Sequence, residues 1–322
     1  MTDGNSASRK AAFQQMSESA GFCRGLEATL IEFSGRDRDS FLHNLCTADI
    51  KGLKPGQGCE LFFTDARGRT IGFGYVLAGE HTLLLSTAAG QSEVLLPHLD
   101  RYRIREDVQF FDHSKDWQQW ALCGPKAESI CQQTLGLEIG AGNLNFVETT
   151  WKGAVLWCCR TDFFGLPGFL LQISSDAAES LATAYSAEAT ECEDAVFDFL
   201  RIRAGSPVFN RDISPKNFPQ EIDRDDRAIS FNKGCYLGQE TVARIDALGQ
   251  VHRLLRKFVV SDTDTIPAAG DQLEAAGQRA GHFTSVSRNP QDGQIVALGL
   301  VRRAHADSGV ELSFDSGKVN VL

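Results

Sequence analysis

The sequence contains no hydrophobic run long enough to cross a membrane as a helix, so we do not expect transmembrane helices. Its first 15 residues are small and polar and lack the apolar core of a signal peptide. The net charge of −10 argues against strong nucleic-acid binding, which needs basic side chains to neutralise phosphates. The basic side chains between Arg201 and Lys257 form either a local basic face or an ordinary solvated surface. We therefore expect a cytoplasmic protein with a mobile N-terminal segment.

No Cys-x-x-Cys pair occurs among the nine cysteines, which lie at positions 23, 46, 59, 123, 131, 158, 159, 192 and 235. Cys158 and Cys159 are adjacent, which is a poor geometry for an ordinary disulfide or a shared zinc site. The seven histidines show no metal-ligand spacing, and neither a phosphate-binding glycine loop nor a nucleophile elbow occurs. The sequence therefore predicts reduced thiols and no metal site.

The hydrophobic pattern predicts a mixture of strand pairs and crossover helices over the first three quarters of the chain. We expect strands at 26–33, 60–63, 70–77, 81–86, 108–112, 119–123, 154–159 and 168–174. We expect helices after Asp37 and at 91–102, 126–135, 176–187 and 193–204. This order favours an α+β core over a doubly wound parallel sheet.

From Val251 onward the helices stop. Short strands at 251–260, 278–287, 295–301 and 310–314 indicate a small antiparallel barrel or sandwich. We therefore predict an α+β region over 1–247 and a small C-terminal β-barrel over 248–322.

Residues 233–240, Lys-Gly-Cys-Tyr-Leu-Gly-Gln-Glu, are the most informative segment for function. Gly234 and Gly238 permit a positive φ or a close approach of the backbone. Lys233 can lower the pKa of Cys235 and so raise its thiolate fraction. The alternative is a turn that merely packs a buried cysteine. Eight consecutive positions, most of them of functional types, favour a reactive thiol.

This segment closely resembles the Lys-Gly-Cys-Tyr-x-Gly-Gln-Glu signature of the YgfZ-type folate-binding proteins. They belong to the superfamily of the glycine cleavage system T-protein, an aminomethyltransferase. Supporting motifs span nearly the whole chain, at 35–42, 46–50, 101–108, 200–207, 219–221, 281–285 and 297–303. The resemblance implies three lobes around a central hole that holds tetrahydrofolate or a related folate, with 1–247 forming two interleaved lobes.

The resemblance also implies a role in iron–sulfur cluster assembly or repair and in cluster-dependent tRNA modification. Iron–sulfur client or assembly proteins would be the partners. Cys235 would be the reactive centre, and because a cluster usually has four ligands, its cluster role would be transient or shared with a partner.

The resemblance and the motif together suggest roles for the neighbouring side chains. Lys233 would activate the thiol, Tyr236 and Gln239 would shape the pocket, and Glu240 would orient Lys233 or Arg244. Further candidate folate contacts are Arg201, Glu221 and Phe163.

Two positions depart from the T-protein pattern. The aspartate that takes part in aminomethyl transfer falls on Gly72 or Phe73, neither of which can act as an acid or a base. The folate-binding glutamate falls on Leu170, which cannot pair with the pterin NH donors. We therefore expect an accessory protein rather than a working aminomethyltransferase. A tetrahydrofolate-dependent aminomethyltransferase and a non-catalytic folate-binding module are the alternatives.

Overall fold

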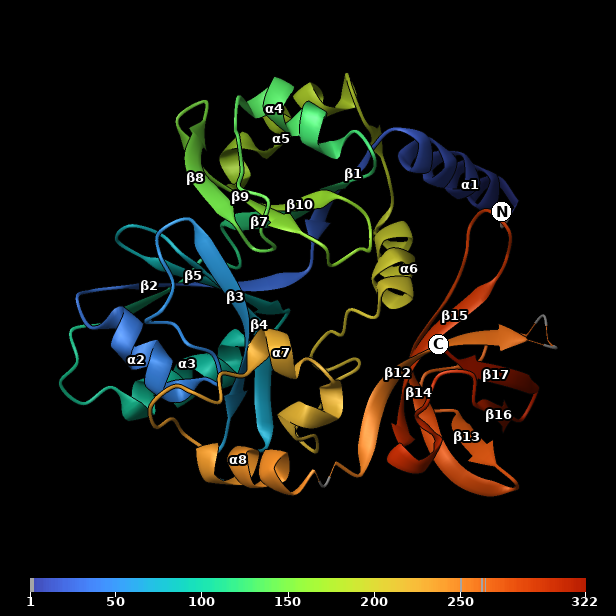
Figure 1. The fold of residues 1–322 in the computed structure, drawn as a ribbon. Helices are drawn as coiled ribbons and strands as arrows, with labels where there is room; N and C mark the ends of the chain where they lie inside the picture. The colour runs from blue at the N-terminus through green and yellow to red at the C-terminus, as the bar shows by residue number, and fades with distance from the viewer. Residues whose placement is uncertain (1–2, 250, 262, 264) are drawn as a thin grey trace.

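The computed structural model describes residues 3–249, 251–261, 263 and 265–322, which form two sheet-containing lobes and a barrel (Figure 1). The predicted α+β class is confirmed, and the C-terminal part is a closed six-stranded antiparallel barrel. Within the described residues, no helix is both long and apolar enough to cross a membrane.

The first lobe is built on a five-stranded sheet in the order β3-β4-β5-β2-β6. Its strands are β2 (Ala28–Ser34), β3 (Gln57–Thr64), β4 (Thr70–Ala78), β5 (Leu83–Ala88) and β6 (Gln109–Asp112). Helices α2 (Arg38–Leu45) and α3 (Ser92–Tyr102) pack on one face of this sheet. Because side chains alternate along a strand, Leu61 and Phe63 of β3 face these helices, whereas Phe62 faces the centre of the molecule.

The second lobe contains a six-stranded sheet in the order β11-β1-β7-β10-β9-β8. Its strands are β1 (Gly21–Leu26), β7 (Trp117–Cys123), β8 (Phe146–Trp151), β9 (Ala154–Thr161), β10 (Gly168–Ser174) and β11 (Thr190–Glu191). Helices α4 (Ala127–Leu135) and α5 (Ser175–Ser186) pack on one face. The two lobes are interleaved in sequence, because β1 belongs to the second lobe and β2 to the first.

The prediction of a mobile N-terminus is wrong, since α1 (Asp3–Glu18) packs beside the second lobe (Figure 1). Phe13 and Met16 of this helix are buried in the central hydrophobic cluster. The ring of Phe13 meets the ring of Phe199 edge-on at 5.6 Å. Two apolar side chains three residues apart are enough to hold one helix face, although the rest of the segment is polar.

The chain passes from the second lobe to the barrel through a series of short helices. These are α6 (Asp194–Ala204), η1 (Pro219–Ile222), α7 (Asp225–Ala228) and α8 (Gln239–Leu248). The barrel order is β12-β15-β14-β13-β16-β17, and a short 3-10 helix, η2 (Arg303–His305), follows β15. Its strands are β12 (Arg253–Ser261), β13 (Gln272–Ala275), β14 (Gln278–Arg288), β15 (Ile295–Arg302), β16 (Glu311–Phe314) and β17 (Gly317–Val321). The proposed division at residues 247 and 248 stays a prediction.

Candidate functional site

The segment 233–240 lies against the first lobe, where β3 turns into β4. The amide of Leu237 donates to the carbonyl of Asn44 at 3.0 Å, and the hydroxyl of Thr64 donates to the carbonyl of Leu237. Gly238 has a φ of +83°, and a β-carbon there would lie 2.5 Å from the carbonyl oxygen of Asp65. Only glycine fits this position. Gly234, by contrast, has a negative φ and open space around it.

Lys233 is buried and binds the end of α2. Its ammonium donates to the backbone carbonyls of His43, Cys46 and Ala48, the last two at 2.8 and 2.6 Å. The ring of Tyr236 lies 4.9 Å away. Carbonyls at a helix C-terminus lack intrahelical partners and carry partial negative charge, so they suit a cation. Burial lowers the pKa of Lys233.

Cys235 is exposed, whereas seven of the nine cysteines are buried and Cys59 is half-buried. Burial raises the pKa of Cys46 to about 11 and the pKa of Cys23 to about 12. Cys235 is therefore the thiol that solvent and large partners reach most easily. Its activation by Lys233 stays a prediction, because the three hydrogen bonds of that ammonium go to backbone carbonyls.

The other predicted residues of the segment divide between the interior and the surface. Tyr236 is buried in the central cluster, where burial raises its pKa. Gln239 is half-buried and Glu240 is exposed in the first turn of α8. No ion pair joins Glu240 to Lys233 or Arg244 within the described residues, so its orienting role stays a prediction.

Of the residues expected to depart from the T-protein pattern, Phe73 and Leu170 lie in one hydrophobic cluster. Phe73 and Leu170 are 7% and 3% exposed, and both belong to the central cluster with Tyr236. The ring of Phe73 packs at 4.7 Å from the ring of Phe62. Gly72 is on the opposite face of β4, where a β-carbon would lie 3.1 Å from Leu95. Phe73 is therefore the residue that faces the centre of the molecule.

Phe163 packs against this same cluster, and its ring meets that of Phe164 edge-on at 5.2 Å. The structure thus places Phe163, Tyr236 and Leu170 around one apolar region. Folate contact by Phe163 stays a prediction.

Arg201 lies in a buried network that joins α6 to the barrel. Its guanidinium donates to Asp198 at 2.6 Å, to Asp212 at 2.7 Å and to the hydroxyl of Ser285 in β14 at 2.9 Å. A further bond goes to the carbonyl of Ser206. These bonds give Arg201 a structural role, and contact with a ligand stays a prediction.

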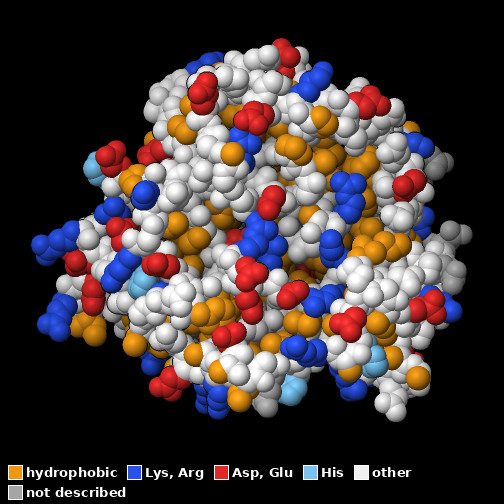
Figure 2. All heavy atoms as spheres, viewed as in Figure 1, with side chains coloured by type: hydrophobic (Ala, Val, Ile, Leu, Met, Phe, Trp, Pro, Cys, Tyr) orange, Lys and Arg blue, Asp and Glu red, His pale blue; other side chains and the backbone are white. Residues whose placement is uncertain are grey.

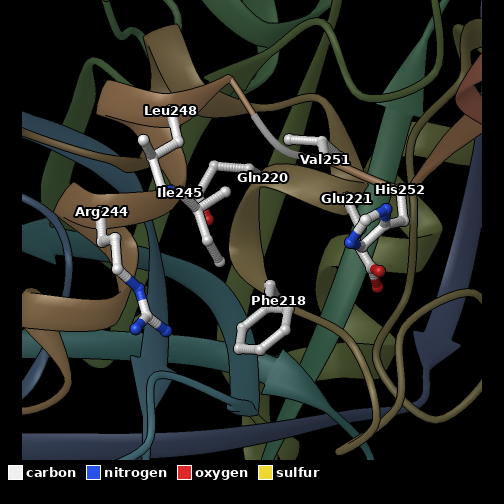
Figure 3. Close-up of a pocket in the computed structure, with 8 residues that line it drawn as sticks. All are labelled: Phe218, Gln220, Glu221, Arg244, Ile245, Leu248, Val251 and His252. Atoms are coloured by element: carbon white, nitrogen blue, oxygen red, sulfur yellow. The ribbon is translucent and has the colours of Figure 1, made fainter.

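Glu221 borders a cavity of about 270 Å³ between η1 and α8, shown in Figure 3. Its carboxylate accepts hydrogen bonds from Asn217 at 2.8 Å and from Arg253 at 3.1 Å. In Figure 3 the ring of His252 lies beside Glu221, and Arg244 extends on the other side of Phe218. The cavity is lined by the last turns of α8, whereas Cys235 precedes its first turn. Glu221 and Cys235 therefore lie toward opposite ends of this helix.

An ion network between the lobes was not anticipated from the sequence. Glu60 of β3 is 8% exposed and accepts hydrogen bonds from Arg224 at 2.8 Å and pairs with Arg227 at 3.1 Å. Arg227 also donates to Asp162 of the second lobe at 2.7 Å. On the face of the molecule drawn in Figure 2, acidic and basic side chains gather near the centre. A carboxylate inside the apolar strand 57–64 was the signal that could have revealed it.

A family model described as the GCVT N-terminal domain matches residues 5–233, and the chain belongs to this family. Among the described residues, no group of three or more His, Cys, Asp or Glu is placed to hold a metal ion.

Similar proteins include named transferases. The chain is 28% identical over 282 residues to a chloroplast protein of Arabidopsis thaliana named as a transferase, with 87% of this chain and 64% of that protein covered. It therefore spans less than two thirds of that relative. It is 28% identical over 277 residues to an aminomethyltransferase of Rubrobacter xylanophilus, with 84% and 73% covered.

The crystal structure of the glycine cleavage system aminomethyltransferase T from Bartonella henselae has the same fold. The TM-score is 0.85 at 21% identity, with 97% of this chain and 87% of that chain covered. The predicted three-lobed T-protein-like architecture is thereby confirmed.

Proposed function

We propose that this protein is a YgfZ-type accessory factor for iron–sulfur cluster assembly or repair, including clusters used in tRNA modification, and that it acts through Cys235. The observation that carries the proposal is the placement of this thiol. Cys235 is exposed on a segment whose next residues are bonded to Asn44 and Thr64. A thiol held in a defined place on the surface is suited to meeting a protein partner.

The chemistry proposed for Cys235 is thiolate ligation of iron. One cysteine supplies one of the four ligands that a cluster usually needs, so the partner protein must supply the others. The proposed partners are iron–sulfur client or assembly proteins, and the cluster is cargo rather than a resident group. A cytoplasmic location is part of the same proposal.

A folate, tetrahydrofolate or a related form, is the proposed cofactor, as suits a member of this family. The residues fit this group only in part. Phe163 and Tyr236 offer aromatic surface beside the central cluster, but Leu170 stands where a carboxylate would pair with the pterin. Neither the cavity beside Glu221 nor a second one, between the segment 214–217 and the barrel, is lined by Phe163 or Arg201. The proposed chemistry therefore includes no step at folate.

Complementation of a deletion strain tests the proposal directly. We expect Cys235→Ser to abolish rescue of growth and of iron–sulfur enzyme activity, while Cys59→Ser, a change at the half-buried cysteine, leaves rescue intact. Full rescue by Cys235→Ser would exclude a reactive role for this thiol. Protein levels measured in the same strains separate loss of function from loss of the protein.

Aminomethyl transfer is the second candidate, and the names of relatives such as the Rubrobacter enzyme favour it. Phe73 argues against it, because its buried ring can neither give nor accept a proton. Purified protein mixed with the aminomethylated lipoyl carrier and tetrahydrofolate is expected to form no methylene-tetrahydrofolate above background. Clear turnover would establish the transferase instead.

A non-catalytic folate-binding module is the third candidate. It requires tetrahydrofolate affinity that survives Cys235→Ser, together with rescue by the same variant. Calorimetry and complementation with this one variant therefore distinguish a binding module from a thiol-dependent factor.

A further inference from the structure

A second cavity, of about 400 Å³, lies between the segment 214–217 and the barrel. It is separate from the segment 233–240, because none of its lining residues belongs to that segment, and it borders the central cluster at Leu300. Its volume is within the usual range of small-ligand pockets, about 300–1,000 Å³.

The described lining of this cavity is basic. Lys216 comes from the segment before η1, Arg253 from the start of β12, and Arg279 and His282 from β14. None of the lining residues is acidic. Lys216 and Arg279 are exposed and form no ion pair within the described part of the chain. In a chain of net charge −10, such a concentration of cations creates a local positive field that attracts anions.

Arg253, whose side chain is 37% exposed, is held in place in the wall of the cavity. The buried carboxylate of Glu221 accepts from its Nη2 at 3.1 Å, and from Asn217 at 2.8 Å. The side chain of Asn217, which is 1% exposed, in turn accepts from the amide of Ser214 at 2.9 Å. Among the described residues, the Nη1 group of Arg253 has no hydrogen-bond partner. Two N–H donors are therefore left for a ligand on a preorganised side chain.

The pKa of His282 depends on the electrostatic field inside this cavity. His282 is half-buried and lies opposite Gln272 in the β13–β14 pair. Burial, Arg279 and Arg253 together lower the pKa of His282. Two carboxylates lie near this pairing: Glu274 is opposite Arg279, and Asp271 precedes Gln272, with its backbone carbonyl accepting from the amide of Phe283 at 3.0 Å. A bound anion would offset the positive charge of the two arginines and raise the pKa of His282.

We propose that this cavity binds a small oligoanion that carries two or more phosphate or carboxylate groups. Arg253 meets one group through its free N–H donors, and the exposed Lys216 and Arg279 meet the other group. Guanidinium and ammonium groups make strong, charge-assisted hydrogen bonds with both kinds of anion.

Calorimetry on the full chain at low salt tests this proposal, with pyrophosphate and citrate as probes. We expect one-to-one binding of at least one probe, and Lys216→Gln combined with Arg279→Gln is expected to weaken it at least about tenfold. The matched control is Lys10→Gln with Lys115→Gln, which changes the net charge equally at exposed positions outside the cavity. The stronger probe identifies whether the natural ligand carries phosphate or carboxylate groups.

A second readout follows the imidazole resonances of His282 by NMR. Adding the bound probe is expected to raise the pKa of His282 in the unmodified protein, and the shift should be lost in the double variant. The proposal fails if neither probe binds, if the double variant binds as tightly as the unmodified protein, or if the control loses as much affinity. Binding of a tRNA transcript without binding of either probe would also overturn it, in favour of a nucleic-acid surface. None of these outcomes bears on Cys235, whose complementation assay uses other variants.

Discussion

The segment around Cys235 and the cluster around Phe73 lie next to each other, yet they are built in opposite ways. The first presents an exposed thiol on a backbone held by polar contacts from Lys233 and Thr64. The second is closed and apolar and contains Phe73 and Leu170, which are expected from the sequence to occupy positions where T-proteins carry carboxylates. Tyr236 connects them, because it follows Cys235 and is buried in the cluster. The difference motivates the proposal that this chain acts through the thiol rather than through a central acid or base.

Placing a carboxylate in the central cluster tests whether this cluster is closed and apolar, and it has the largest expected effect. We expect Phe73→Asp to lower the free energy of unfolding by at least about 4 kcal/mol, because it removes a packed ring and buries an unpaired charge. Urea denaturation measures the effect, and Phe73→Leu is the matched apolar control. A small loss for Phe73→Asp would mean that this position is open to solvent, as an acid–base site would be.

Removing the carboxylate between the lobes should have the next largest effect. Glu60→Gln leaves Arg224 and part of the Arg227 contact without their charge partner, so we expect a loss of about 3 kcal/mol in the free energy of unfolding. Glu80→Gln, at an exposed position, is the control and should change it by less than about 0.5 kcal/mol. Equal effects of the two changes would show that the network does not stabilise the junction.

Lys233→Met tests how strongly the lysine holds the thiol segment in place. It leaves the carbonyls of His43, Cys46 and Ala48 without this donor, which should cost about 2 kcal/mol of unfolding free energy. Hydrogen exchange at the Leu237 amide should become faster, with Lys51→Met as the exposed control.

Alkylation of Cys235 distinguishes the two roles of this lysine. The rate should stay within a few-fold of the unmodified protein if Lys233 acts only on the backbone. A steep fall in rate in Lys233→Met would instead show that the ammonium activates the thiolate.

Asp225, at the start of α7, allows a pH test with the smallest expected effect. Burial and the neighbouring Asp223, Asp246 and Asp226 raise the pKa of Asp225 to about 6. Because the folded state holds this proton more tightly than the unfolded state, ionisation destabilises the fold as pH rises from about 4 to about 6. Asp225→Asn should therefore add about 1–2 kcal/mol of unfolding free energy near pH 7.5 and almost none near pH 4.

The control for this test is Asp315→Asn, at an exposed position in the barrel that is not among the charges acting on Asp225. Urea denaturation at the two pH values gives the comparison. A gain from Asp225→Asn that is equal at both values would contradict the assigned pKa.

The elements that were predicted correctly have strong local patterns. Runs of apolar residues revealed β4 and β15, and Gly205 ends α6 with a φ of +85° as a helix stop should. The helix α1 was missed because few of its side chains are apolar. The helix α8 was missed although half of its side chains are apolar, and among these Val242 is buried. Phe13 and Met16 secure α1 only because the surfaces of β1 and α6 are present to receive them.

The sequence by itself determined the α+β order and the C-terminal barrel, and it singled out residues 233–240 as a candidate site. Each depends on neighbouring residues: the period of the apolar pattern, the turn residues and, at Gly238, a backbone angle that other residues rarely adopt. Only the tertiary structure decided what Lys233 binds, because its carbonyl partners lie 185–190 residues earlier in the chain. It also decided that Phe73, Leu170 and Tyr236 meet in one cluster. Contacts over such separations depend on how whole lobes pack, and no local pattern of residues encodes that packing.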